Sequence, residues 1–426
     1  GKRILKVVAF CMLLFGVVAG ISRLVERKES RQKMQPFLDR AGEYDVLFLG
    51  DSIMNTGVFP MEMWEKYGIA GYNIASYGNT LPITYWALQN ALDYAKPKLV
   101  VLDVQGVSKS YKLSGNSSDV HTAFDCYSIS KTKIEALDDL MDDPNAVDDD
   151  GVAYVDMKWE YLFTLGKYHA RWSELTDTDF HPVYNREKGA KSVIAVADIG
   201  DYDLIDENMA TEESGQTGFV YLRKIIEDCQ ARGIDVLLVH LPYPANEQQQ
   251  MDANAVAYIA EDYGLNYIDF VSMDQVADYA TDCFDAHEHL NPSGARKVSD
   301  YLGRYIAAHY DVADRRGEAA YAAWEDDAAA YREKKLALIQ KIPTPITPIN
   351  MDKEHNHITL AYFDKKSTVD YIGVVQGVPV CFDAKECTAD TFPLHNIHEH
   401  QMEFMGEFEQ QGGISFLIIF FSKKDE

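Results

Sequence analysis

Short apolar runs that alternate with amphipathic stretches are the strongest constraint on how residues 44–335 can fold. Five runs are typical of short buried strands: Asp45–Leu49, Tyr72–Ala75, Leu99–Val104, Ile234–His240 and Leu265–Phe270. Two stretches between them, Tyr85–Tyr94 and Val220–Ala231, repeat apolar residues with the i, i+3, i+4 spacing of helices. This alternation predicts a three-layer α/β domain in which helices cover both faces of a parallel sheet. In such sheets the chemistry lies beyond the carboxyl ends of the strands.

The first predicted strand ends directly in Gly50-Asp51-Ser52, and Ile53 can begin a helix. A serine at a strand-to-helix turn has an exposed hydroxyl. Its backbone N–H lies near a helix N-terminus, where it can help to hold an oxyanion. The tripeptide by itself is more often an N-capping serine than a nucleophile.

A second group of candidates precedes the last predicted helix of this domain, which starts near Asn291 because asparagine caps helices and proline follows it. Asp285 and His289 lie on the loop just before it. A serine nucleophile needs an imidazole to accept its proton and a carboxylate to orient that imidazole. Asp285 and His289 can supply both, and His287 is a rival base. His240, at the end of a strand, is expected to pack or to contact substrate.

The motifs LFLGDSI, Gly78-Asn79 and D-x-x-x-HLNPSGARK together resemble the SGNH/GDSL hydrolase superfamily, and within it the membrane-anchored DltD- and AlgX-like acyl-transfer proteins. With FTLGKYHARWSEL and DRRGEAAYAAW, the likeness extends over about residues 40–330. It implies that Ser52 is the nucleophile, His289 the base and Asp285 its orienting partner, with no cofactor. The Ser52 amide, Gly78 and Asn79 would form the oxyanion hole.

Two departures from that superfamily stand in the chain. The usual D-x-x-H has one extra residue, and Gln105-Gly106-Val107 replaces the usual G-x-N-D block. The resemblance implies acyl transfer through an acyl-enzyme, with water as acceptor in an esterase or a sugar hydroxyl in an O-acyltransferase. By analogy, the expected substrate is an acyl ester such as acetylated cell-envelope polysaccharide.

The N-terminus contains fifteen uncharged residues, Val7–Ile21, with Lys and Arg on both sides. Ile4 and Leu5 can lengthen this run toward the ~20 residues of a membrane span. Since no A-x-A cleavage site follows, we predict a signal anchor over 1–22 rather than a cleaved secretory peptide. We expect a polar helical stalk over 23–43 and the bulk of the chain outside a bacterial cytoplasm.

Residues 336–426 differ in character from the domain before them. IPTPITPI indicates a boundary or an edge strand. The stretches that follow predict a strand, a hairpin with a turn at Gln376-Gly377, a helix and a final strand. The hairpin would bring Asp370 near Asp383 and Lys385, and the latter two share one strand face. Two carboxylates can hold Mg²⁺ while a lysine activates water, although an ordinary charged strand has the same pattern.

The wider pattern of ALIQKIPTPI, AYFDKKSTVDYIGVVQG, FDAKE and FPLHNIHEHQMEFM resembles a RecU-type Holliday-junction resolvase of the PD-(D/E)xK nuclease class. The resemblance implies that Asp370 and Asp383 are metal ligands, Lys385 is catalytic and Gln401 supports them, with Mg²⁺ as cofactor and branched DNA as partner. Asp383 stands where these resolvases more often have Glu. We expect a truncated unit of this type over 336–426.

Composition bears on both readings. The formal net charge is −27, and residues 331–426 have 10 Lys and Arg against 14 Asp and Glu. Neither value is typical of a chain that binds phosphate backbones. Six cysteines without C-x-x-C pairs argue against a disulfide scaffold or a zinc ribbon.

An exported acyl-transfer domain (44–335) and a cytoplasmic DNA nuclease cannot both operate in one membrane topology. The chain is therefore a fusion of two genes, or a protein whose nuclease-like tail is a retired module, or a protein whose apolar N-terminus does not direct export. We predict a membrane-anchored serine esterase or O-acyltransferase. The alternatives are a Mg²⁺-dependent junction nuclease and an inactive glycan-binding module.

Overall fold

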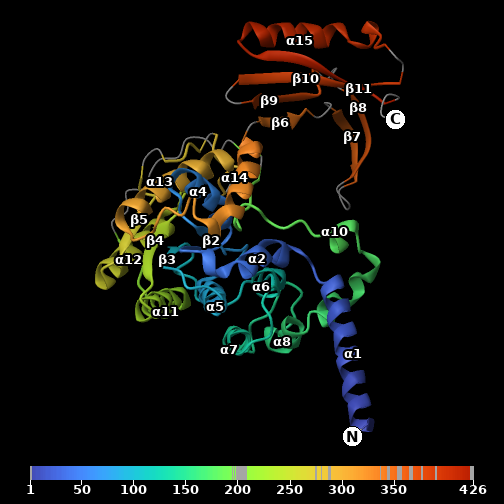
Figure 1. Ribbon diagram of the computed structural model, residues 1–426. Helices are drawn as coiled ribbons and strands as arrows, with labels where there is room; N and C mark the ends of the chain where they lie inside the picture. Colours follow the sequence, from blue (N-terminus) through green and yellow to red (C-terminus); the bar gives the residue numbers. More distant parts are fainter. Residues whose placement is uncertain are drawn as a thin grey trace. The chain divides into compact units, whose positions relative to one another are not determined.

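The computed structural model describes residues 2–193, 195, 197, 209–273, 276–279, 281–285, 289–335, 337–342, 346–352, 357–363, 368–375, 378–388 and 391–422. The chain divides into two compact units, Gly1–Ala328 and Ala329–Glu426, and each is described by itself (Figure 1). The division falls a few residues before the expected boundary at 335/336, inside a helix. The rival base His287 and the expected turn at Gln376-Gly377 lie outside the described residues.

The first unit is built on a five-stranded parallel sheet. Its strands are β1 (Val46–Leu49), β2 (Gly71–Asn73), β3 (Leu99–Asp103), β4 (Asp235–His240) and β5 (Asn266–Asp269). They lie in the order β2-β1-β3-β4-β5, and every neighbouring pair is parallel. The prediction of an α/β domain with a parallel sheet is thus confirmed. The chain reverses its direction of winding between β1 and β3, which is where ligands bind in sheets of this kind.

Helices cover both faces of this sheet, as expected for strands that are apolar throughout. Figure 1 shows α4 and α13 over one face and α5 and α11 over the other. The helices and 3₁₀ turns of the first unit beyond α1 and α2 are η1 (Ala41–Glu43), α3 (Ser52–Gly57), α4 (Pro60–Tyr67), α5 (Leu81–Leu92), α6 (Ser117–Phe124), α7 (Lys131–Leu140), α8 (Tyr154–Leu162), α9 (Leu165–Tyr168), η2 (His169–Ser173), α10 (Asp177–Phe180), α11 (Thr217–Ala231), α12 (Glu247–Tyr263), α13 (Pro292–His309), η3 (Ala319–Tyr321) and the first part of α14 (Ala322–Lys335).

Helix α13 begins where the sequence predicts. Asn291 is its N-cap, and the Asn291 side-chain oxygen accepts hydrogen bonds from the backbone N–H groups of Ser293 and Gly294. Val298, Leu302 and Ile306 are fully buried on one stripe of the helix. This apolar stripe packs α13 onto the rest of the unit. The position of the N-terminus of α13 is therefore fixed, and with it one end of the preceding loop.

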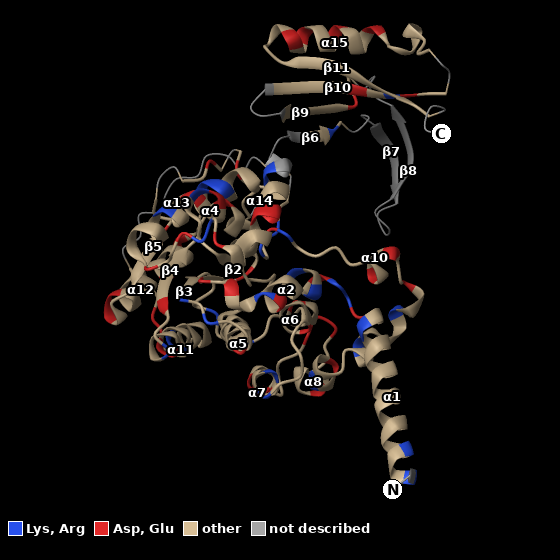
Figure 2. Ribbon diagram, viewed as in Figure 1, with Lys and Arg blue, Asp and Glu red and all other residues tan. Residues whose placement is uncertain are grey.

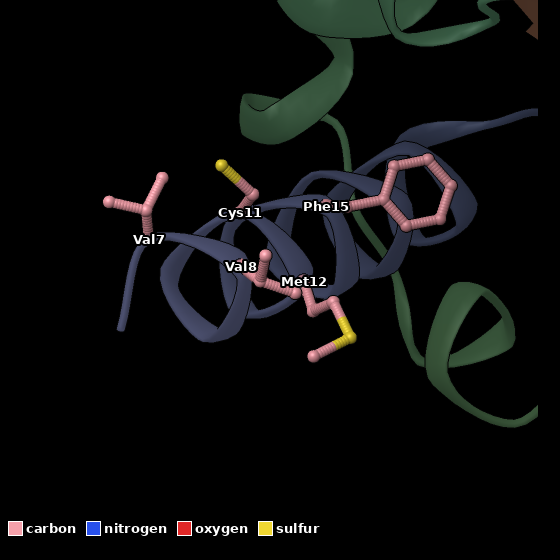
Figure 3. A pocket seen from close by; sticks show the side chains of 5 residues that line it. All are labelled: Val7, Val8, Cys11, Met12 and Phe15. Atoms are coloured by element: carbon pink, nitrogen blue, oxygen red, sulfur yellow. The ribbon is translucent and has the colours of Figure 1, made fainter. Parts of the chain in front are cut away.

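The first helix, α1 (Lys2–Val25), exposes its apolar side chains. Residues Arg3–Val25 form a helix long and apolar enough to cross a membrane. Figure 3 shows a shallow hollow on this helix, lined only by the outward-pointing side chains of Val7, Val8, Cys11, Met12 and Phe15. In Figure 2, basic residues stand at both ends of α1, with uncharged residues between. This distribution is consistent with a membrane anchor.

The polar helical stalk expected over 23–43 is helical over Glu29–Asp39, but it packs on the first unit. Helix α2 (Glu29–Asp39) packs on the body, with Ser30, Met34 and Phe37 buried. The ring centroid of Phe37 lies 5.3 Å from those of Tyr44 and Tyr72. Positions 30, 34 and 37 lie on one side of the helix, so α2 packs through two apolar residues and a serine although most of its other residues are polar.

The second unit contains a four-stranded mixed sheet in the order β11-β10-β9-β6. Its elements are β6 (Ala337–Lys341), β7 (Ile346–Asp352), β8 (His357–Phe363), β9 (Tyr371–Val375), β10 (Val378–Cys387), η4 (Leu394–Asn396), α15 (Glu399–Gln410) and β11 (Ile414–Phe421). A small core of Val369, Cys381 and Met405 joins α15 to the sheet. The predicted order of strand, hairpin, helix and strand is confirmed, and β7 pairs with β8 in a separate two-stranded sheet.

Candidate active sites

A sharp turn after β1 presents Ser52. Gly50 has φ +154°, and a Cβ there would lie 2.9 Å from the Cβ atoms of both Asp103 and Met54. Only glycine therefore lets the chain pass between them. The Asp51 side chain accepts a hydrogen bond from the Ile53 N–H at 2.9 Å and caps α3. Ser52 is consequently the first residue of α3 rather than its cap, so its hydroxyl is not used for capping.

The loop before α13 presents Asp285 and His289. Its two arms are joined by an isolated bridge between Cys283 and Leu290 and by the Phe284 N–H, which donates to the His289 carbonyl at 3.0 Å. The ring of Phe284 stacks on the imidazole of His289, with centroids 5.3 Å apart. Asn291 supports the base of the loop because its side-chain amide donates to the Cys283 carbonyl.

Ser52, His289 and Asp285 form one chain of hydrogen bonds. The Ser52 Oγ lies 2.8 Å from His289 Nε2, and His289 Nδ1 lies 2.6 Å from Asp285 Oδ2. Asp285 Oδ1 also accepts from the His289 backbone N–H at 3.2 Å. The structure thus brings together two residues that are 237 positions apart in the sequence. A hydroxyl, an imidazole and a carboxylate in this order are the arrangement for activating a serine.

The packing of α13 explains why Ser52 and His289 lie close together. Strand β5 lies at the far edge of the sheet from β2. Helix α13 then packs against α3 and α4. Deep in this contact the Phe59 backbone N–H donates to the Ser299 hydroxyl at 2.7 Å. The same contact therefore fixes the start of α3, with Ser52, and the start of α13, next to His289.

The predicted oxyanion residues lie on the turn after β2. The buried Asn79 side-chain amide donates to the Gly50 carbonyl at 3.2 Å, which ties this turn to the Ser52 turn. Asn79 Oδ1 accepts no hydrogen bond from any described residue. Gly78 has φ +64°, and a Cβ there would collide with the Asp119 carboxylate. Asn79 thus joins this turn to the Ser52 turn, and the backbone conformation of Gly78 favours glycine.

Asp103, at the end of β3, is a buried carboxyl that sequence reasoning did not single out. Its Oδ1 accepts from the Leu241 backbone N–H at 3.3 Å. Burial, followed by the charge of Asp51, holds the pKa of Asp103 well above its usual range. The signal available in the sequence was an acidic residue at the end of a predicted strand. In the structure this residue lies next to Gly50. His240 packs against Tyr243, with Nε2 2.9 Å from the phenol oxygen, and burial lowers its pKa.

Lys33 of α2 is the second residue that the sequence analysis missed. Its ammonium donates to Asn55 Oδ1 at 2.6 Å and to the Ala75 carbonyl. Asn55 belongs to α3, and Ala75 begins the turn that carries Gly78. Burial and the nearby Lys191 lower the pKa of Lys33 to about 7. The signal was a lysine beside the buried positions of a helix that otherwise reads as a polar stalk.

The second unit gathers all four of its candidate residues around the fully buried Asp383. Asp383 Oδ2 accepts from Gln401 Nε2 at 2.9 Å and pairs with Lys385 Nζ at 2.6 Å. Its Oδ1 accepts from the Asp370 backbone N–H at 3.1 Å. Asp370 Oδ2 in turn accepts from the Ala384 N–H at 3.0 Å. Burial and the adjacent Asp383 raise the pKa of Asp370.

This cluster fits a Mg²⁺ site with two carboxylates. Asp370, whose pKa is raised, lies beside a second carboxylate, an arrangement that a cation would stabilise, and Mg²⁺ needs only one or two carboxylates besides water. Within the described ranges no group of three or more His, Cys, Asp or Glu side chains is placed to hold a metal ion. If this cluster binds Mg²⁺, Asp370 and Asp383 are its candidate ligands.

Comparison with known proteins bears first on the C-terminal part. Residues 316–426 match the family RecU, described as recombination protein U. The Holliday junction resolvase RecU of Pediococcus pentosaceus is 38% identical over 136 residues, which cover 31% of this chain and 68% of that protein. The chain belongs to the RecU family. The predicted RecU resemblance is thereby confirmed.

Coverage differs among the RecU relatives. The Holliday junction resolvase RecU of Leuconostoc mesenteroides is 46% identical over 100 residues, which cover 22% of this chain and 49% of that protein. The chain thus spans between about half and two thirds of the length of these RecU proteins, and the match leaves most of the first unit outside it.

Among solved structures, a GDSL-like lipase from Bacteroides thetaiotaomicron is 10% identical with a TM-score of 0.30. The alignment covers 62% of this chain and 89% of the lipase. A score of this size carries no argument about the first unit. The case for a hydrolase rests instead on the strand order and on the hydrogen bonds among Ser52, His289 and Asp285.

Proposed function

We propose that the first unit is a serine esterase or O-acyltransferase, with Ser52 as nucleophile, His289 as general base and Asp285 as its orienting carboxylate. The observation that carries the proposal is the pair of contacts at 2.8 Å and 2.6 Å that joins the three side chains. Contacts of this length allow proton transfer without rearrangement. Structural serines have no need of a histidine–carboxylate pair at this separation.

The proposed reaction proceeds in two acyl transfers. His289 Nε2 accepts the proton of Ser52 while the Ser52 oxygen attacks the ester carbonyl. The Ser52 and Gly78 amides, with Asn79, would stabilise the oxyanion. His289 then gives the proton to the leaving alcohol, and an acyl-Ser52 ester remains. Water, or a sugar hydroxyl, attacks this ester with His289 again as base, which frees Ser52.

The proposed substrate is an acyl ester of the cell envelope, such as acetylated polysaccharide. Support comes from the exposed apolar helix α1 next to the first unit, which would hold the unit at the extracytoplasmic face of a bacterial membrane. Release of acetate from acetylated glycan would indicate an esterase, and a new ester on a second glycan would indicate an O-acyltransferase.

Hydrolysis of p-nitrophenyl acetate by the purified full chain tests the proposal. Ser52→Ala should lower kcat by at least about 10³-fold, since removing a serine nucleophile disables the whole triad. Ser128→Ala, at an exposed serine, is the matched control and should keep full activity. A Ser52→Ala protein that retains wild-type turnover would falsify the assignment. Absence of turnover in the wild type would favour an inactive glycan-binding module.

A second candidate function is Mg²⁺-dependent cleavage of branched DNA by the RecU-family unit. The observation in its favour is the contact of Asp370, Lys385 and Gln401 with the buried Asp383. Mg²⁺ bound there would stabilise charge on the scissile phosphate. Lys385 would orient the attacking water and Gln401 would hold Asp383 in place.

Cleavage of synthetic four-way DNA junctions in the presence of Mg²⁺ tests the second candidate. Lys385→Ala should abolish cleavage, whereas Lys341→Ala, at an exposed lysine of β6, should not. Cleavage that persists in Lys385→Ala would remove the proposed role of this residue. A chain inert on junctions with intact esterase activity would instead support a retired nuclease module.

A further inference from the structure

Exposed aromatic side chains lie on the helical segment α8–α10, most of which packs against the apolar helix α1. Four of them lie between residues 154 and 184 and keep more than half of their surface in solvent. We name them the aromatic collar: Trp159 (68% exposed), Phe163 (55%), Trp172 (72%) and Phe180 (56%). Tryptophan and phenylalanine are rarely left exposed together in a soluble domain without a partner. The collar therefore needs an explanation that the acyl-transfer site does not give.

Hydrogen bonds fix the collar at the level of the last turn of α1. The Ser22 hydroxyl lies 2.9 Å from the Thr164 hydroxyl, next to Phe163. Arg171 donates to the Val25 carbonyl at 2.6 Å, next to Trp172. Helices α9, η2 and α10 all pack against α1. The collar is thus joined to α1 within one folded unit.

The position of the collar along α1 matches the expected position of a bilayer surface. The 23-residue span Arg3–Val25 is about 35 Å long, slightly more than the ~30 Å of a hydrocarbon core. Ser22 lies about 4.5 Å inside the end of that span. Phe163 would then reach the acyl chains, and Trp172 would lie at the headgroups, where tryptophan is favoured.

Charges near the collar are mixed. Arg23 and Arg27 are exposed at the end of α1, in the zone where Lys and Arg contact lipid phosphates, and Glu174 and Asp177 are exposed on the collar segment. The exposed apolar side chains of α1 and the collar belong to one folded unit. Among possible occupants, a lipid surface is the one that the apolar helix α1 would itself meet.

We infer that the aromatic collar inserts into the membrane interface and fixes the orientation of the first unit on the bilayer. This inference rests on the proposed membrane anchor, not on the acyl-transfer chemistry. The unit would lie on the membrane rather than hang from a flexible tether. The Ser52 site would then be kept at one height above the lipid, which suits substrates attached to the envelope.

Tryptophan quenching in the full-length protein tests the collar. The protein is reconstituted into phosphatidylcholine–phosphatidylglycerol vesicles whose acyl chains are brominated near the headgroup, because bromine quenches only tryptophans in contact with lipid. The chain has five tryptophans, of which Trp64 and Trp324 are buried. Trp159→Phe with Trp172→Phe should reduce the quenched emission about two-fold or more. Trp86→Phe, on α5, should leave it unchanged.

Two outcomes contradict the inference, and they are distinguishable. Vesicle flotation that leaves the full chain in the dense fraction overturns the anchor, and the collar with it. Flotation with equal quenching in wild type and in the double variant keeps the anchor and overturns the collar. Esterase activity is measured separately and decides only the chemistry of Ser52.

Discussion

The two candidate sites of this chain differ in how much of their hydrogen bonding is already complete. In the first unit the hydrogen bonds of Asp285 and His289 lead to the Ser52 hydroxyl, which is free to react. In the second unit both oxygens of Asp383 are held by protein donors. In the proposed functions, Ser52, His289 and Asp285 can act without a further group, whereas the Asp383 cluster needs a cation or a substrate.

The contrast also separates two kinds of evidence. The RecU relatives identify the family of the second unit by sequence, while in the first unit side-chain geometry carries the case. The family match and the hydrogen-bonded serine, histidine and aspartate thus belong to different parts of the same chain. Experiments that treat the two sites independently are the most informative.

The largest expected effect is reciprocal loss of two activities. Ser52→Ala should remove ester hydrolysis by at least about 10³-fold and leave junction cleavage within about two-fold, and Lys385→Ala should do the opposite, because each is central to only one site. Chelation of Mg²⁺ should stop junction cleavage and leave ester hydrolysis unchanged. Both rates are measured on each purified variant. Loss of both activities in either variant would mean that the sites are not independent.

Asp285→Asn should lower kcat for ester hydrolysis by about 10²- to 10⁴-fold, because an amide cannot hold the His289 imidazole in the tautomer that accepts the serine proton. Asp262→Asn, at an exposed position of α12, is the control and should have no effect. The measurement is the pH profile of kcat together with the melting temperature. A pure loss of stability with an unchanged kcat would make Asp285 merely structural.

Gln401→Leu should destabilise the second unit by about 1–3 kcal/mol, since the buried Asp383 loses a hydrogen-bond donor. Hydrogen exchange of the β10 amides reports the local opening free energy. Gln410→Leu, exposed on the same helix, serves for comparison and should change it little. Equal protection in the two variants would show that Gln401 is not needed to stabilise Asp383.

The most gradual expected effect concerns Lys33, whose pKa is lowered to about 7 by burial and by Lys191, with Cys126 acting in the opposite direction. Its pKa in the unfolded chain is about 10.4. Between these values the unfolded state binds more protons, so this group makes stability rise with pH, by no more than about 1.4 kcal/mol per pH unit.

Lys33→Met removes that contribution to the pH dependence of stability. The unfolding free energy of the wild type should therefore rise more steeply between pH 7 and pH 10 than that of the variant. Lys131→Met, at an exposed lysine, should keep the wild-type slope. Parallel curves for wild type and Lys33→Met would mean that the Lys33 ammonium remains charged in the folded state.

Much of the fold could be predicted because it depends on local pattern. The strands and the start of α13 follow from apolar runs and from the Asn291 cap. Ser52 and His289 could be paired because the loops at the carboxyl ends of parallel strands converge. Asp383 and Lys385 could be paired for a different reason, because alternate residues of one strand point to the same face.

Other features depend on packing between distant segments and could not be predicted. The raised pKa of Asp103 comes from burial beside Asp51, and neither cause is visible in a sequence window. Helix α2 has mostly polar residues, so its burial through Phe37 depends on the shape of the surface that receives it. The contacts of Lys33 with Asn55 and with the Ala75 carbonyl follow from the burial of α2.

The position of α2 decides how a water-soluble form of this protein should be made. Truncation at residue 44 would delete Phe37, which contacts Tyr44 and Tyr72, and Lys33, which contacts Asn55 and the Ala75 carbonyl. Truncation before Ser22 would delete most of the lipophilic helix and retain these supports. Inactivity of the protein truncated at residue 44 would therefore reflect the loss of α2, and would not show that the full chain lacks activity.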